Sequence, residues 1–252
     1  MKALLRIAFL GTNYCGYQVQ PNGLTIQQRL NEAAKALFGF DCDIVGCSRT
    51  DSGVHANEFV IAVSRKGSDE LTTSVPVEKL PVALSNLLPE DISVLSAQMV
   101  PGDFHPRYDV KYKEYLYQIW NAPVRNPFLN DRAWHCVRPM DDEAMANMQK
   151  AAALWIGTHD FSSYMAANSS VTDTVRTITE VEVSRQGDMV VFRVCADGFL
   201  YHMVRILVGT LIEVAYGRLH PDDIPLITDA RNRHLAGATA PACGLYLNRV
   251  VY

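Results

Sequence analysis

The segment Gly46-Cys47-Ser48-Arg49-Thr50-Asp51-Ser52-Gly53-Val54-His55-Ala56 is the most informative stretch of this chain. A predicted strand at 44–47 overlaps its start and another at 59–64 follows it, so the segment connects two predicted strands. A carboxylate held at a tight turn beside the fixed cation of Arg49 stays charged and keeps one orientation. A reaction led by a carboxylate needs such an arrangement. The plainer interpretation is an ordinary Asp-Ser-Gly turn in which Asp51 bonds its own backbone.

Composition describes an ordinary globular protein of 252 residues, with 48% hydrophobic and 20% charged residues. The length fits one large domain or two smaller halves. The N-terminus alternates as a strand does and lacks the long apolar run of a signal peptide. The longest apolar stretch, 203–216, contains Arg205 and Glu213 and is too short to span a bilayer. We therefore expect a cytoplasmic protein with no membrane segment.

Cysteine spacing and net charge bear on whether the protein has a metal site, disulfides or a nucleic-acid-binding surface. None of the six cysteines forms a Cys-x-x-Cys pair, and the seven histidines are scattered, so we expect reduced cysteines and no metal site. The formal net charge of −4 is unlike that of most nucleic-acid binders, which are basic. Acidic residues gather in a few short clusters, however, and a local basic surface elsewhere is compatible with this total.

Periodicity predicts a mixed α+β protein. Helices are expected at 24–38, 77–88, 141–156, 202–216 and 221–230, and strands at 2–10, 44–47, 59–64, 92–99, 113–120, 175–184, 189–196 and 244–251. Thr25 and Gln28 form a capping-box pattern at the start of the first helix, and Gly39 follows its end. The order of elements suggests two α+β halves, 1–105 and 106–252, with no internal sequence repeat. Two such halves could fuse their sheets around a central cleft.

Three further segments carry groups capable of chemistry. Tyr115 and Tyr117 share one face of a predicted strand, where an aromatic ring could stack on a base; tyrosine also packs well in any strand. Arg205 lies in an apolar helix, where it is either buried and paired, with Asp51 as a candidate partner, or extended to water at the helix edge. The segment 103–107, which ends in Arg107, is either a contact for a polyanion or a simple connection. The segment 160–164 has the same two interpretations, and we favour packing for it.

Taken together, these segments resemble one known family. Arg49-Thr50-Asp51-x-Gly53-Val54-His55, Phe104-His105-Pro106-Arg107, Lys113-x-Tyr115-x-Tyr117 and His202-Met203-Val204-Arg205 are similar to landmarks of the TruA family of tRNA pseudouridine synthases, in the same order. The first string is highly specific, and the landmarks cover essentially the whole chain. The chain departs from the usual pattern at Ser52, where the family has alanine, and at Tyr17, where it has tryptophan.

The resemblance implies two fused ferredoxin-like halves with mostly antiparallel sheets and a central cleft, in a homodimer. It implies isomerisation of uridines 38, 39 and 40 in the tRNA anticodon arm, without cofactor or metal. By the same resemblance Asp51 is the catalytic aspartate, Tyr115 stacks on the target base and accepts its C5 proton, and Arg205 pairs with Asp51. Arg49, His55 and Arg107 are expected to contact the substrate. Ser52 and Gly53 would be small so that a nucleotide can approach.

Two other functions fit parts of the sequence. A non-catalytic RNA-binding module could use the same scaffold, although the presence of Asp51, Tyr115 and Arg205 together argues against it. An unrelated carboxylate enzyme such as a glycosidase would need a second catalytic carboxylate. No second carboxylate stands in a comparable motif.

Overall fold

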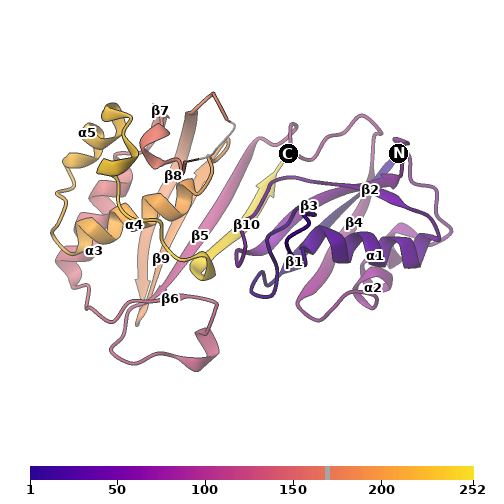
Figure 1. The fold of residues 1–252 in the computed structure, drawn as a ribbon, viewed down its shortest axis with the longest axis horizontal. Coiled ribbons are helices and arrows are strands. Elements are labelled where there is room, and N and C mark those ends of the chain that lie inside the picture. The colour runs from indigo at the N-terminus through magenta and orange to yellow at the C-terminus, as the bar shows by residue number, and fades with distance from the viewer. Residues whose placement is uncertain (168–170) are drawn as a thin grey trace. The chain divides into compact units, whose positions relative to one another are not determined.

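The computed structural model describes residues 1–167 and 171–252 as a mixed α+β protein (Figure 1). The chain divides into two compact units. Unit 1 contains Met1–Lys111 and the terminal segment Tyr246–Tyr252, and unit 2 contains Tyr112–Leu245. No helix of the described residues is long and apolar enough to cross a membrane.

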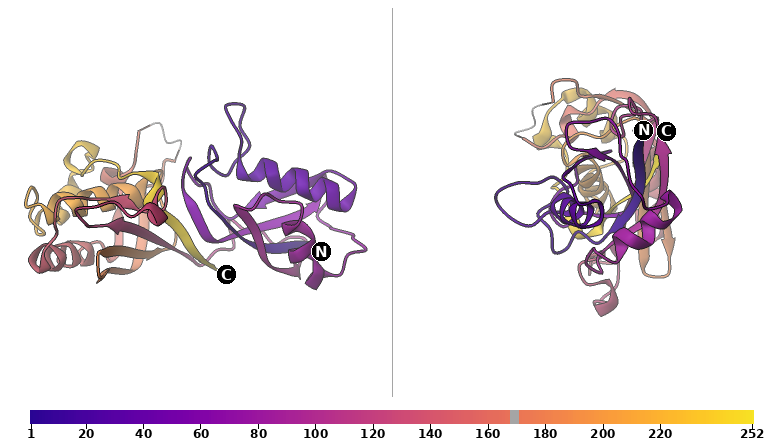
Figure 2. Two further views of the ribbon diagram at one scale, coloured as in Figure 1. Left: turned by 90° about the horizontal axis from the view of Figure 1, so that it is seen from below. Right: turned by 90° about the vertical axis from the view of Figure 1, so that its right-hand side faces the viewer.

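Unit 1 is built on an antiparallel sheet. Its elements, in chain order, are β1 (Lys2–Phe9), α1 (Ile26–Phe38), β2 (Cys42–Gly46), β3 (His55–Arg65), η1 (Val77–Lys79), α2 (Leu80–Ser85), β4 (Ile92–Val100) and most of β10 (Leu245–Val251). The strand order is β4-β1-β3, with β2 also paired to β3. Figure 2 shows α1 lying over one face of these strands. This β-α-β-β-α-β order with antiparallel pairing is that of a ferredoxin-like unit.

The first helix illustrates how local sequence sets an element. Thr25 accepts a hydrogen bond from the Gln28 amide at the N-terminus, and Gly39 adopts φ = 76° after the last turn. The Gln28 side chain bonds Glu32 and not the Thr25 amide, so only one half of the expected capping box forms. Residues Ile26 and Leu30, with two alanines that follow, bury one face of the helix.

Unit 2 also combines an antiparallel sheet with helices. Its elements are β5 (Tyr112–Trp120), η2 (Pro127–Leu129), β6 (Trp134–His135), α3 (Asp142–Ala153), β7 (Gly157–Asp160), η3 (Ser162–Tyr164), β8 (Val175–Gln186), β9 (Met189–Ala196), α4 (Met203–Ala215), α5 (Asp223–Ala230), η4 (Arg233–Leu235) and η5 (Ala242–Gly244). The strands run in the order β5-β9-β8-β7, all antiparallel, with β6 parallel to the end of β5. Nearly every residue of α4 is buried, as its apolar sequence predicts.

The division into units differs from the expected halves in two respects. The boundary falls after Lys111, and the last strand returns to unit 1. Both follow from hydrogen bonding: Tyr246 and Leu247 pair in parallel with the start of β3, and the Lys111 amide donates to Val251. These contacts hold the segment between β4 and β5 against the C-terminal strand in unit 1.

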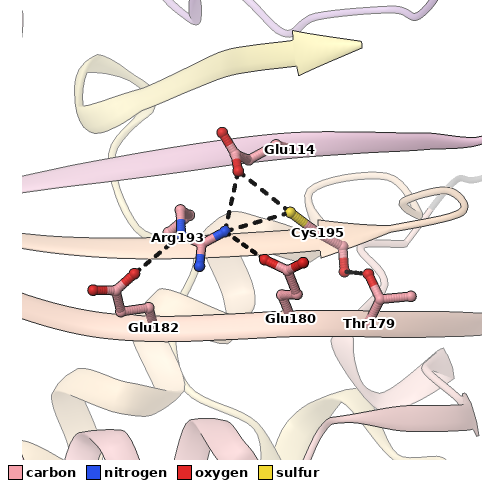
Figure 3. A network of polar contacts seen from close by, with 6 residues as sticks. All are labelled: Glu114, Thr179, Glu180, Glu182, Arg193 and Cys195. Carbon is pink, nitrogen blue, oxygen red and sulfur yellow. Dashed lines mark hydrogen bonds and ion pairs between the residues drawn. The ribbon is translucent and has the colours of Figure 1, made fainter. Parts of the chain in front are cut away.

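On the unit 2 sheet, one arginine links three strands (Figure 3). Arg193 of β9 binds Glu180 and Glu182 of β8 at 2.8 and 3.1 Å, and Glu114 of β5 at 3.1 Å. The hydrogen bond with Glu180 contributes most to raising the pKa of Arg193. Burial raises the pKa of the neighbouring Cys195 thiol to about 12, so this cysteine stays protonated at neutral pH. The predicted period-2 pattern of the strands therefore separates a charged face from the core.

Candidate active site

Asp51 lies at the tip of the connection between β2 and β3, which is a tight turn as its sequence predicts. The Val54 amide donates to the Asp51 carbonyl at 3.2 Å, and Gly53 adopts φ = 78°. Only glycine adopts this left-handed conformation without strain, which explains Gly53 without reference to a ligand. At the start of the connection the Cys47 amide donates to Val60 of β3. The Asp51 side chain is half-buried, and Arg49 on the same turn is exposed.

The loop after β1 fixes one side of this turn through Gly11. The Gly11 amide donates to Nδ1 of the buried His55 at 3.0 Å. A Cβ atom at position 11 would lie only 2.0 Å from the Val54 carbonyl oxygen. Glycine is therefore needed because the two backbones touch, and His55 keeps them together.

The same loop holds the other side of the turn. Gly16 has φ = 81° and passes so close to Thr50 that a Cβ would lie 2.5 Å from its carbonyl oxygen. The Ser52 hydroxyl donates to the Tyr14 carbonyl at 3.1 Å. Alanine could not form this bond. Ser52 therefore has a structural role besides the expected one, which was to leave room for a nucleotide. Tyr14 and the two glycines were not predicted as supports, although glycines at positions 11 and 16 of one loop are typical of close backbone contact.

Tyr17, where the family usually has tryptophan, packs under the turn. Its ring stacks on Phe59 with centroids 4.4 Å apart, and a Cβ at Gly46 would lie 2.7 Å from the ring. Burial raises the pKa of Tyr17, and within the described chain its hydroxyl has no hydrogen-bond partner. An aromatic ring fills this space well, whereas the hydroxyl is poorly accommodated.

The two remaining substrate-contact candidates in unit 1 differ in exposure. His55 has an exposed fraction of 0%, and its ring lies 4.7 Å from that of Tyr246. Arg107 is exposed on a connection that Tyr252 holds through a 2.7 Å hydrogen bond to the Pro106 carbonyl. His55 thus supports the Asp51 turn from within, and Arg107 presents a cation to solvent. Their contacts with substrate stay predictions.

Tyr115 and Arg205 belong to unit 2. Tyr115 shares the buried face of β5 with Tyr117 and Ile119, as the period-2 pattern predicts. Its ring meets Phe199 edge-on at 4.9 Å and 79°. Phe199 stands in the same sequence segment as Arg205, but its contact with Tyr115 was not predicted. For Tyr117 the packing interpretation is correct, since its exposed fraction is 0% and its hydroxyl bonds the Pro241 carbonyl at 2.7 Å.

Arg205 is half-buried on α4, and a neighbouring segment orients its guanidinium. Its Nε donates to the Ala240 carbonyl at 2.7 Å, and the Ala240 amide donates back to the Arg205 carbonyl at 3.1 Å. The same segment approaches α4 at Gly209, where a Cβ would lie 1.7 Å from the Ala238 carbonyl oxygen. Arg205 is therefore a positioned cation in unit 2 and not a side chain that extends freely to water.

Several known proteins are similar to this chain over most or all of its length. A family model described as tRNA pseudouridine synthase matches residues 151–252. The tRNA pseudouridine synthase A of Moorella thermoacetica is 46% identical over 250 residues, and that of Acetivibrio thermocellus is 43% identical over 248 residues, each covering 98% of both chains. That of Bacillus pumilus is 43% identical and covers 100% of this chain and 99% of its own.

A solved Cbf5-Nop10-Gar1 complex is 12% identical with a TM-score of 0.35, covering 82% of this chain and 53% of that one, which is too distant to carry an argument. The full-length relatives, together with the family model that matches the C-terminal part of the chain, define the class of protein as a pseudouridine synthase, an isomerase. Given identities above 40% over nearly its full length, the chain belongs to the tRNA pseudouridine synthase A (TruA) family. The resemblance found in the sequence motifs is thereby confirmed.

Proposed function

We propose that this protein converts uridine to pseudouridine at positions 38, 39 and 40 of the tRNA anticodon arm, with Asp51 as its catalytic carboxylate. The observation that carries the proposal is the turn of Asp51. Contacts from Gly11, Gly16 and Tyr14 hold that turn on both sides, in a chain of this family. Such a rigid support is what a reacting side chain needs to keep its orientation.

The reaction needs few chemical groups. The bond between N1 of uracil and C1′ of ribose breaks, the base turns, and a bond from C5 to C1′ forms. The C5 proton leaves and N1 gains a proton, so nothing is oxidised or hydrolysed. An Asp51 carboxylate can start this sequence by attack on the sugar or the base, or by removal of a sugar proton.

The other candidate residues bind the substrate or orient Asp51. Tyr115 stacks on the flipped uracil in place of its lost neighbours and accepts the C5 proton. Arg205 pairs with Asp51, and its hydrogen bond to Ala240 supports a fixed orientation of the guanidinium. Arg49 and Arg107, which are exposed, contact the nucleotide or its neighbours, and the buried His55, expected as a contact, acts on the substrate only through the turn that it supports. We further propose that the protein acts in the cytoplasm as a homodimer.

Pseudouridine mapping on defined tRNA transcripts tests the positions. Transcripts with a single uridine at 38, 39 or 40 should each gain one pseudouridine when incubated with the purified protein, and a transcript with cytidine at all three should gain none. Modification elsewhere in that control would contradict the assigned positions. Binding without any modification would favour the RNA-binding module. Light scattering of the same preparation should give twice the mass of one chain.

A further inference from the structure

The connection from β5 to α3, residues 121–140, exposes an unusual set of side chains. We call it the β5–α3 loop; in Figure 1 it projects beyond the end of the unit 2 sheet and contains β6 and η2. Phe128 of η2 is 84% exposed and Val124 is 74% exposed. Single exposed apolar residues are ordinary on protein surfaces. Here, however, the exposed aromatic ring occurs among exposed arginines, which are Arg125, Arg132 and Arg138.

The loop is basic in an acidic protein. Its three arginines and one aspartate, Asp131, give a formal charge of +2, whereas the whole chain has −4, so the other residues total −6. The Arg125 guanidinium forms no ion pair with any residue that the structure describes. Arg138 lies 4.3 Å above the ring of Tyr216, which holds it by a cation–π contact and leaves the residue exposed.

The ends of the loop are fixed by two side chains. The Asn121 amide donates to the carbonyls of Cys136 and Arg138 at 2.9 and 2.8 Å, and its oxygen accepts the Met140 amide at 3.0 Å. Arg185 of β8 donates to the Met140 carbonyl and to the Asn121 oxygen at 2.6 and 2.7 Å. The loop therefore returns to the sheet at one defined place.

The segment that bears Phe128 is ordered as well. The Asn126 side chain accepts the Phe128 amide at 3.0 Å, and the Trp120 indole donates to the Val124 carbonyl at 2.9 Å. The Ala133 amide then closes the turn onto the Leu129 carbonyl at 3.1 Å. An exposed aromatic ring on a fixed backbone loses little conformational entropy when it binds, which suits a contact surface.

We propose that the β5–α3 loop is a second tRNA contact, separate from the Asp51 turn. In this contact Phe128 stacks on a base or ribose, and Arg125 and Arg138 bind phosphates. This inference rests on the proposed tRNA substrate. Aromatic rings stack on any unpaired base, and guanidinium groups bind phosphate by two parallel hydrogen bonds. A second copy of the chain is a poorer occupant, because a two-fold contact through this loop would bring like charges together.

The test compares binding and turnover for Phe128→Ala and Arg125→Ala. Phe128→Ala should raise the tRNA Kd and KM about tenfold, which is typical for loss of one aromatic–base stack, while kcat at saturating tRNA stays unchanged. Arg125→Ala should also weaken binding and reduce the slope of log Kd against log salt by about one. Phe128→Trp, which keeps a stacking surface, should restore affinity.

Matched controls are Leu226→Ala, an apolar side chain 68% exposed on α5, and Lys66→Ala, an exposed cation of unit 1. Neither should change tRNA affinity or its salt dependence. The inference is overturned if Phe128→Ala and Arg125→Ala bind tRNA as the wild type does. It is also overturned if Phe128→Ala weakens binding only because a dimer dissociates, as light scattering would show. Failure of the proposed function is distinct, since the wild type itself would then form no pseudouridine.

Discussion

Replacement of Gly11 by alanine tests how closely activity depends on the support of the Asp51 turn. The added Cβ would lie 2.0 Å from the Val54 carbonyl oxygen, while Cβ atoms in proteins essentially never approach an atom closer than 3.0 Å. The β1 loop and the Asp51 turn must therefore separate by 3.0 − 2.0 = 1.0 Å or more. The same shift would lengthen the 3.0 Å hydrogen bond from the Gly11 amide to His55 beyond useful range.

A displacement of about 1 Å in a catalytic group lowers turnover by about 100-fold. We expect that loss in kcat for Gly11→Ala, with a smaller change in tRNA affinity because Arg49 moves with the turn whereas Arg107 and the β5–α3 loop lie outside it. Overpacking should lower the free energy of unfolding by about 1–3 kcal/mol, so the variant still folds. Release of tritium from C5-labelled tRNA under single-turnover conditions measures the rate, and thermal unfolding measures the stability.

Gly198→Ala is the matched control, because the nearest atoms to its Cβ, at 3.2 Å, belong to the flexible side chain of Arg176. It should leave turnover unchanged. A folded Gly11→Ala variant with the turnover of the wild type would refute the reasoning, since the turn would then tolerate displacement.

Three further substitutions give smaller tests. Tyr17→Phe removes a buried hydroxyl that has no partner in the described chain and should raise the free energy of unfolding by up to about 1 kcal/mol in urea denaturation; a loss of stability would show that the hydroxyl is satisfied. Arg205→Lys loses the planar fork and the Nε bond to Ala240, so kcat should fall more than tRNA affinity; an unchanged kcat would count against the pairing with Asp51. Burial alone would raise the pKa of Asp160, but hydrogen bonds, including one from Thr174, outweigh burial and lower it. Since its folded-state pKa is lowered, the stability it contributes is present above its ordinary value of 3.8 and is lost as pH falls through the folded value. Asp160→Asn should therefore lower Tm at pH 7 and make little difference in strong acid, and an equal effect at both would exclude an electrostatic origin.

Much of the fold could be predicted because its elements are set by local sequence. The predicted first helix and the closing strand were confirmed to within about two residues. The predicted helix at 77–88 instead forms η1 and the short helix α2, with Pro81 near its start. β3 begins at His55, before the predicted Phe59, because Ala56 gains partners from β1 and β10 that local propensity does not reveal.

The main candidate residues of the site could be predicted from the sequence, but the contacts that hold them in place could not. A rare motif identified Asp51, and one apolar helix made Arg205 conspicuous. The contact of Gly11 with Val54 joins segments more than 40 residues apart, so no local pattern contains it. The same is true of the Ser52 hydroxyl, whose acceptor, the Tyr14 carbonyl, lies on another loop.

Pseudouridine formation by Asp51→Asn tests the central claim most directly. The substitution keeps the size of the side chain, and the turn itself is closed by the Asp51 carbonyl, so the fold should persist. The account predicts that Asp51→Asn binds tRNA as the wild type does, forms no pseudouridine and releases no C5 tritium. Pseudouridine at positions 38, 39 or 40 in the presence of folded Asp51→Asn would contradict it.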